Sequence, residues 1–103
     1  GIYERYFEAD GKRYHHILNP KTGYPEDNEL ASVSIISPSS TTCDGLSTTC
    51  FLLGLKDGME LIESLDNTEA IMITRDKKIY LSSGFKNGKI PFKLISSDYT
   101  VVN

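Results

Sequence analysis

The residues best suited to chemistry in this sequence are Asp44, Ser47 and Thr48, within the stretch TTCDGLSTTCFLLG at positions 41–54. On a helix, residues three and four positions apart are neighbours, so we expect these three side chains to share one face. A carboxylate and two hydroxyls are hard oxygen donors, the kind that Mg²⁺ and Ca²⁺ accept. The start of a helix also offers unpaired N–H groups and a positive dipole end, which favour phosphate. The spacing therefore predicts a metal and phosphate site near a helix start.

A simpler interpretation stays open for the same residues. Thr41 and Asp44 fit a capping box, in which Asp44 would only satisfy N–H groups of the first helical turn. Serine and threonine inside helices often bond back to the preceding turn. The apolar stripe expected to face the core consists of Cys43, Leu46, Cys50 and Leu53.

The composition is that of a small globular domain. The chain has 103 residues, of which 39% are hydrophobic and 24% charged, enough for one core. A formal net charge of −3 and the lack of a basic run argue against nucleic-acid binding. The two cysteines would lie about 10.5 Å apart along one helix, too far for a disulfide. The sequence opens directly in a strand-like segment, so we expect it to be a piece of a longer protein.

Two strands are expected before the helix. Residues 3–9 and 12–17 flank Asp10-Gly11, a typical two-residue hairpin turn. His15 and His16 fall in the second strand, where successive side chains point to opposite faces. Only one of them can face a given site, and strand periodicity does not choose between them.

The segment between this hairpin and the helix contains a loop and a strand. In the loop NPKTGYP at positions 19–25, Lys21 and Thr22 are candidate cofactor contacts to phosphate or hydroxyl groups, although a plain turn explains them equally well. Residues 31–36 (ASVSII) predict a strand that enters the core. Residues 37–40 supply hydroxyls that can cap the helix, and Gly54 can close it.

The remainder predicts a second helix from Asp57, with its own capping box, to about Leu65. The expected later strands are a hairpin of residues 70–74 and 78–82, followed by residues 92–95 and 99–102. Together these elements predict an α+β fold, a mainly antiparallel sheet with two helices packed on it.

Three segments also carry a family resemblance: YHHILNPKTGYP at 14–25, ASVSII at 31–36 and CDGLST at 43–48. In this order and spacing they resemble the C-terminal part of the FAD:protein FMN transferases, the ApbE-type flavin transferases. The resemblance runs from about Tyr3 to Leu81. It implies that residues 1–103 form a single-domain fragment of a T-fold-like domain whose N-terminal FAD-binding part is absent.

The resemblance also implies an activity. Such enzymes bind FAD with Mg²⁺ on its pyrophosphate, transfer FMN to a threonine or serine hydroxyl of a target protein, and release AMP. It implies that Asp44 and Thr48 bind the metal, with Ser47 where some members carry another oxygen ligand. It places His16 at the FAD and reaction centre, as a catalytic and cofactor-binding residue. His16 would assist deprotonation of the incoming hydroxyl, or hold the phosphate when protonated.

Several expectations follow. Asn19 stands where the family usually has Asp, so the loop keeps its turn bonding and loses a charge. The isolated chain should bind FAD weakly, if at all, and should not transfer FMN. The alternative functions are an Mg²⁺-dependent FAD pyrophosphatase and a non-catalytic flavin-binding module. Many relatives are exported lipoproteins, so we expect the parent protein to be lipid-anchored in the cell envelope through a segment upstream of Gly1.

Overall fold

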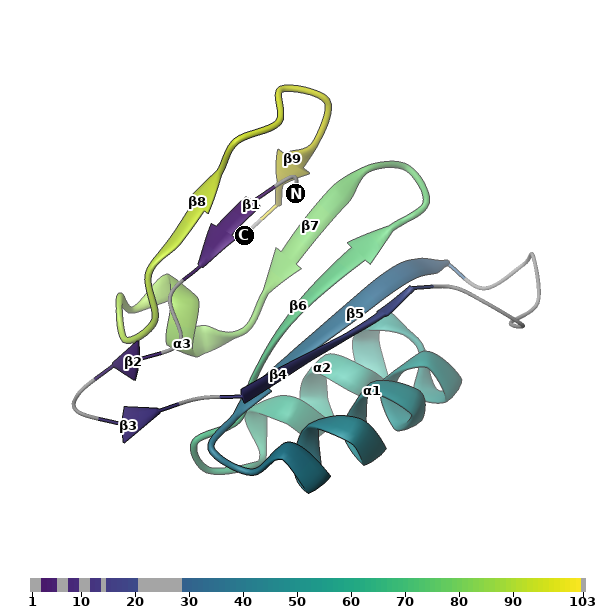
Figure 1. Cartoon of the computed structure of the whole chain (residues 1–103). Helices are drawn as coiled ribbons and strands as arrows, with labels where there is room; N and C mark the ends of the chain where they lie inside the picture. The colour runs from purple at the N-terminus through teal and green to yellow at the C-terminus, as the bar shows by residue number, and fades with distance from the viewer. Residues whose placement is uncertain (1–2, 6–7, 10–11, 14, 21–28, 103) are drawn as a thin grey trace.

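The structure, a computed structural model, describes residues 3–5, 8–9, 12–13, 15–20 and 29–102. Its centre is a five-stranded sheet with the strand order β4-β5-β6-β7-β9 (Figure 1). The strands are β4 (His15–Pro20), β5 (Leu30–Ser37), β6 (Glu69–Thr74), β7 (Lys78–Leu81) and β9 (Thr100–Val101). Neighbouring strands are antiparallel, except that β7 and β9 are parallel. The predicted α+β fold with a mainly antiparallel sheet is confirmed.

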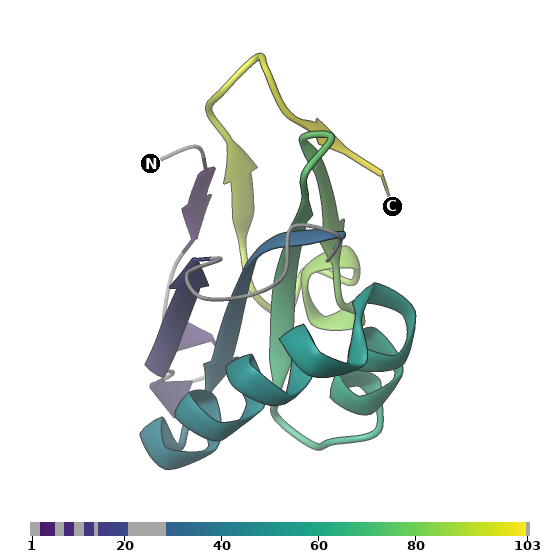
Figure 2. The ribbon, with the colours of Figure 1, turned by 90° about the vertical axis from the view of Figure 1, so that its right-hand side faces the viewer.

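Two helices cover one face of this sheet, as Figure 2 shows. Helix α1 (Ser40–Leu53) packs on β4 and β5, and α2 (Leu55–Glu63) packs on β6 and on α1. A third helix, α3 (Ser83–Lys86), follows β7 and was not predicted. Four residues are too few to show helical periodicity in a sequence. None of the helices in the described part of the chain is both long and apolar enough to cross a membrane.

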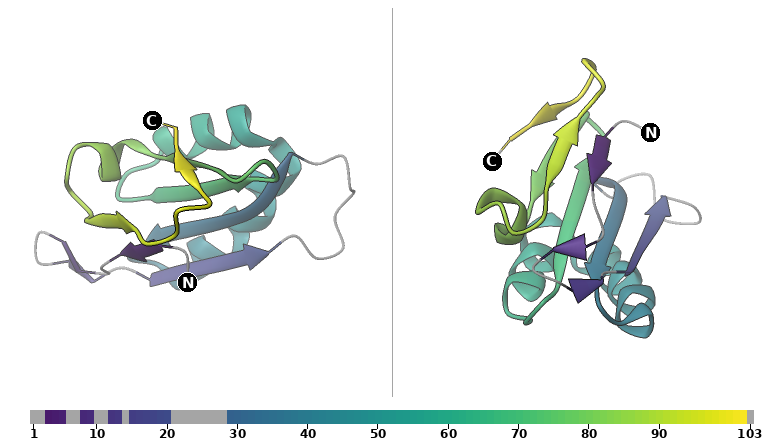
Figure 3. Two further views of the ribbon diagram at one scale, coloured as in Figure 1. Left: turned by 90° about the horizontal axis from the view of Figure 1, so that it is seen from above. Right: turned by 60° about the vertical axis from the view of Figure 1, so that its left-hand side comes forward.

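Two short strand pairs complete the fold. Strand β1 (Tyr3–Arg5) pairs with β8 (Phe92–Leu94), so segments from opposite ends of the chain lie side by side (Figure 3). Strand β2 (Glu8–Ala9) pairs with β3 (Lys12–Arg13), which confirms the predicted hairpin pairing, although its turn at Asp10-Gly11 lies outside the described residues. The prediction of one strand over residues 12–17 is wrong, because β3 and β4 belong to different sheets.

Both faces of the sheet are buried, which explains why its central strands are so apolar. The cluster between the sheet and the two helices includes Val33, Ile35, Met72, Cys50 and Ile62. The cluster on the opposite face includes Ile36, Ile71, Ile73, Ile79 and Ile90, with Phe92 and Leu94 of β8 packed against it. All six residues of β6 are buried.

The junction between the helices differs from the prediction in its boundaries. Gly54 closes α1 as predicted: its N–H donates to the Cys50 carbonyl, and its φ of 90° suits glycine. Helix α2 then begins at Leu55 and ends at Glu63, so the predicted start at Asp57 and end at Leu65 are wrong. The Leu55 N–H donates to Oε1 of Glu29 at 2.9 Å, so the acceptor at this helix start lies 26 residues away in sequence. Local sequence patterns cannot reveal such a contact.

Candidate metal site on helix α1

The start of α1 decides between the two interpretations of Asp44. Ser39 is the N-cap, and its side-chain oxygen accepts the Thr42 N–H at 3.3 Å. The Ser39 N–H in turn donates to Ser37 Oγ at 3.2 Å. The predicted capping box of Thr41 and Asp44 is therefore wrong, because α1 begins earlier and its first turn contains no acidic residue. Asp44 lies in the second turn, where it does not cap the helix.

Asp44 and Thr48 lie one helical turn apart on α1, and both are exposed. Within the described residues, the structure gives neither side chain a hydrogen bond or an ion pair. Side chains four residues apart on a helix are neighbours, so a carboxylate oxygen and a hydroxyl oxygen can converge on one cation. The structure thus places both residues on the exposed side of α1, and their role as metal ligands stays a prediction.

Ser47 lies in a different environment. Its side chain is only 2% exposed, and its hydroxyl donates to the backbone carbonyl of Asp44 at 3.2 Å. The expectation that the three side chains share one face does not hold for Ser47, which is buried while Asp44 and Thr48 are exposed. Relative to Asp44, helix geometry turns Ser47 by about 60° in one direction and Thr48 by about 40° in the other. The first direction leads to the core.

The buried face of α1 is formed by Cys43, Ser47, Cys50 and Phe51. Leu53 was expected on this stripe, but it is 44% exposed, because it lies about 80° around the helix from Cys43, in the direction opposite to Ser47 and Phe51. Both cysteines are free thiols with no exposed surface. Burial raises the pKa of Cys43, and it raises the pKa of Cys50 to about 11. Neither thiol is therefore suited to nucleophilic chemistry at neutral pH.

The two histidines of β4 take neighbouring places in the sheet register. His15 pairs with Ser37, and His16 pairs with Ile36. Ser37 supports the Ser39 cap of α1, whereas Ile36 belongs to the core on the other face of the sheet. Strand β4 itself packs beside α1. Thr22, the predicted cofactor contact, lies outside the described residues, and so does Lys21.

A polar hollow at the N-terminal end of α1 was not predicted from the sequence. Its lining includes Ser37, Ser39 and Thr42 together with Leu65, Asp66, Asn67 and Thr68. The last four residues follow α2, and only the fold brings them to the start of α1. The hydroxyls of Ser37 and Thr68 already make hydrogen bonds within the protein, to the Ser39 N–H and the Asp66 carbonyl.

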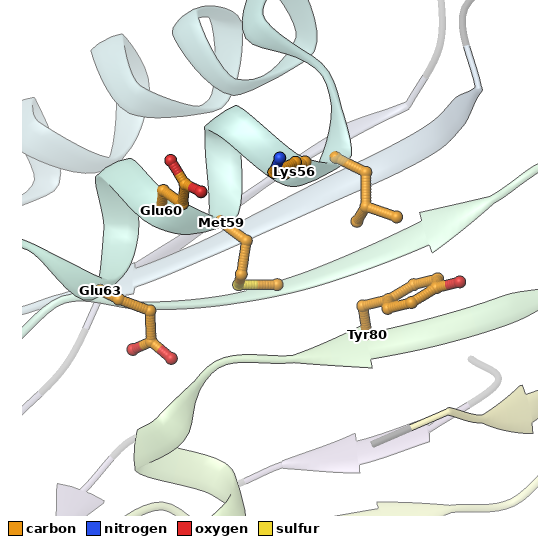
Figure 4. Close-up of a pocket in the computed structure, with 6 residues that line it drawn as sticks. Lys56, Met59, Glu60, Glu63 and Tyr80 are labelled. Atoms are coloured by element: carbon orange, nitrogen blue, oxygen red, sulfur yellow. The ribbon is translucent and has the colours of Figure 1, made fainter.

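A second, mostly apolar pocket lies between α2 and β7. It is lined by Leu55, Lys56, Met59, Glu60, Glu63 and Tyr80 (Figure 4). The Glu63 carboxylate accepts both the N–H and the hydroxyl of Ser83 at the start of α3. This pocket contains none of the residues predicted from the sequence to bind metal or cofactor.

The described residues contain no group of three or more histidine, cysteine, aspartate or glutamate side chains that could hold a metal. Helix α1 therefore offers one charged ligand and one neutral ligand. Mg²⁺ usually takes only one or two protein carboxylates and completes its shell with water and substrate phosphates. The donor set on α1 fits such a site as one side of it.

Comparison with known proteins identifies the family. The family described as ApbE matches residues 1–72. The chain belongs to the ApbE family. It is 44% identical over 103 residues to the FAD:protein FMN transferase of Klebsiella pneumoniae (strain 342), and this match covers 100% of the chain and 32% of the relative. It is 45% identical over 84 residues to the FAD:protein FMN transferase of Treponema pallidum (strain Nichols), covering 82% of the chain and 23% of the relative.

A solved structure agrees with this ApbE-family assignment. The flavin transferase ApbE from Vibrio cholerae matches with a TM-score of 0.61 and 26% sequence identity, over 73% of this chain and 30% of that one. The resemblance inferred from the three sequence segments is thus confirmed, and so is the fold. The chain spans about a third or less of the length of these relatives.

Proposed function

We propose that this chain is part of an Mg²⁺-dependent FAD:protein FMN transferase. The reaction moves FMN from FAD to a threonine or serine hydroxyl of an acceptor protein and releases AMP. Two relatives with this name are 44% and 45% identical to the chain. The observation that carries the proposal is the placement of Asp44 and Thr48, which are exposed and one turn apart, with no hydrogen bond or ion pair from either side chain to another described residue.

In this proposal α1 holds the metal. Asp44 supplies negative charge and Thr48 supplies a neutral oxygen. Ser47 is a third candidate: its hydroxyl donates its hydrogen to the Asp44 carbonyl, which leaves the oxygen lone pairs for a cation, but the side chain is only 2% exposed and would have to become accessible. When bound, the cation would stabilise the charge that builds up on the pyrophosphate oxygens as the bond breaks.

The strand β4 and the loop after it would complete the reactive side of the site. We propose that His16 is the base that accepts the proton of the incoming hydroxyl, because a neutral imidazole does this at physiological pH. Thr22 is proposed to contact the cofactor. Both roles rest on the family resemblance of the segment at positions 14–25.

The metal role is tested with Asp44→Asn and Thr48→Val in the full-length protein, with FMN transfer and AMP release measured against Mg²⁺ concentration. Both variants should need more Mg²⁺ and turn over more slowly. Thr49→Val is a matched control, because Thr49 is also exposed on α1 but its hydroxyl donates to the Gly45 carbonyl. Unchanged Mg²⁺ dependence in both Asp44→Asn and Thr48→Val would refute the metal site.

The same assay separates the alternatives. An FAD pyrophosphatase would release AMP and FMN at the same rate with and without an acceptor protein. A non-catalytic flavin-binding module would bind flavin without Mg²⁺ and release no AMP.

Two further proposals concern where the parent protein is located and whether this chain is active on its own. We propose that the parent protein is exported and lipid-anchored in the cell envelope, which membrane fractionation of the native host would test. The described residues offer only part of a metal shell, so we expect this chain alone to bind FAD weakly and transfer no FMN. Turnover by this chain alone would contradict that expectation.

A further inference from the structure

Asn87 and Gly88 form an exposed turn between α3 and β8 that the proposed site does not use. Gly88 has a φ of 82°, and apart from its two chain neighbours no described residue has an atom within 4 Å of the place where a Cβ would stand. Gly88 therefore adds no side chain that could hinder the approach of its backbone nitrogen to the Asn87 side chain. We propose that Asn87 is a site of non-enzymatic deamidation.

The reaction is an intramolecular acyl transfer. The Gly88 nitrogen attacks Cγ of Asn87, and a new C–N bond closes a five-membered succinimide ring. The bond from Cγ to the side-chain nitrogen breaks, and that nitrogen leaves as ammonia with the proton lost by Gly88. Water then opens the ring at one of its two carbonyl carbons, giving aspartate or isoaspartate. No oxidant or reductant takes part.

The attack requires the Asn87 backbone to rotate from its ψ of 3° so that the Gly88 nitrogen approaches Cγ, and two contacts at the turn bear on it. The Lys89 N–H donates to Oδ1 of Asn87 at 2.9 Å, which folds the side chain back along the turn. The same hydrogen bond polarises the carbonyl whose carbon is attacked. The Gly88 N–H donates to the Phe85 carbonyl through a long hydrogen bond of 3.3 Å.

The consequence reaches the core through Ile90. This residue is fully buried, and its N–H donates to the Gly84 carbonyl at 3.0 Å. Isoaspartate at position 87 adds a methylene to the main chain three residues before Ile90. Aspartate changes only the charge of an exposed side chain. Isoaspartate should therefore disturb Ile90 and the edge-to-face contact of Phe85 with Phe92, and aspartate should not.

To test the proposal, the protein is incubated in mildly alkaline buffer and then digested. Mass spectrometry of the peptides measures the fraction in which the NH₂ of an asparagine side chain has been replaced by OH. Asn67 is the internal comparison, because it precedes the buried, branched Thr68. The Asn87 peptide should convert at least several-fold faster, part of it should resist a protease that cuts before aspartate, and Asn87→Gln should remove the signal. Equal rates at Asn87 and Asn67, or no conversion at Asn87, would overturn the proposal.

Thermal unfolding tests the structural consequence. Asn87→Asp carries the charge of the product without the longer backbone, so its unfolding temperature should stay close to that of the unmodified protein. The fraction that contains isoaspartate should unfold at a lower temperature than Asn87→Asp. Identical unfolding temperatures would show that the turn does not transmit the change to Ile90.

Discussion

The carboxylate of Glu69 accepts the backbone N–H of Gly84 at 2.9 Å. The same oxygen accepts the hydroxyl of Ser82, whose own oxygen accepts the Ala70 N–H. Glu69 is only 7% exposed, so this buried charge is stabilised by hydrogen bonds from the start of α3. Together with the bonds from Glu63 to Ser83, it fixes the first turn of α3 to β6 and α2.

The packing of Gly84 against this carboxyl group predicts a large effect of a small substitution. A methyl group at Gly84 would overlap the Glu69 carboxyl group. Gly84→Ala should therefore lower the free energy of unfolding by about 1–3 kcal/mol. Gly45→Ala is the matched control, because Gly45 lies inside α1 with open space around it, and alanine there should stabilise by about 0.5–1 kcal/mol. Chemical denaturation measures both, and equal effects would contradict the close packing.

Removal of the carboxylate should also destabilise the protein. Glu69→Ala leaves the Ser82 hydroxyl and the Gly84 N–H without their acceptor in a buried place, which should cost about 1–3 kcal/mol or more. Glu69→Gln keeps a carbonyl oxygen in position and should cost less. If alanine and glutamine had the same effect in urea unfolding, the hydrogen bonds would not be the source of the stabilisation.

The buried thiol of Cys50 predicts a pH dependence. Burial raises its pKa from 9.0 to about 11 in the folded state. Between pH 9.0 and about 11 the unfolded chain has lost this proton and the folded chain still holds it, so stability falls as the pH rises. Cys50→Ala should lose this part of the decrease, although the variant is less stable overall. Comparing the slopes of unfolding free energy against pH across that window checks this, and parallel slopes would contradict it.

The adjacent histidines predict different outcomes for the same substitution. His16→Gln should lower FMN transfer by about 100-fold or more, the range expected for a lost general base, and His15→Gln should leave most of the activity. The variants test neighbouring register positions of one strand, opposite Ile36 and Ser37. Rates measured across pH in the full-length protein should lose the dependence on an imidazole only in His16→Gln. The reverse result would move the role to His15.

Much of the fold was predictable because it follows local rules. The serine-rich loop before α1, the glycine after it and the core strand predicted at residues 31–36 all appear in the structure as expected. Helix boundaries were less predictable, since Ser39 rather than Thr41 caps α1, and the N–H of Leu55 at the start of α2 is bound by the distant Glu29. A serine run offers several possible caps, and the sequence does not rank them.

In the candidate site, too, the relations set by local helix geometry were predictable from the sequence, and those set by tertiary packing were not. Asp44 and Thr48 could be paired from spacing alone, because the helix fixes their relation. The burial of Ser47 depends on which side of α1 meets the sheet, and that is decided by packing against β4 and β5. The polar hollow at the start of α1 needs residues 65–68, which only the tertiary fold brings there.

The pairing of β1 with β8 bears on how the chain folds. Tyr3 and Leu94 are register partners, so the contact closes a stretch of about 90 residues. The entropy lost in closing so long a segment is recovered only after the intervening strands have formed, which places this pair among the last contacts to appear. Strands β6 and β7 are joined by residues 75–77 alone and share a core with β5, so we expect these three strands to form first and β1 to pair with β8 afterwards.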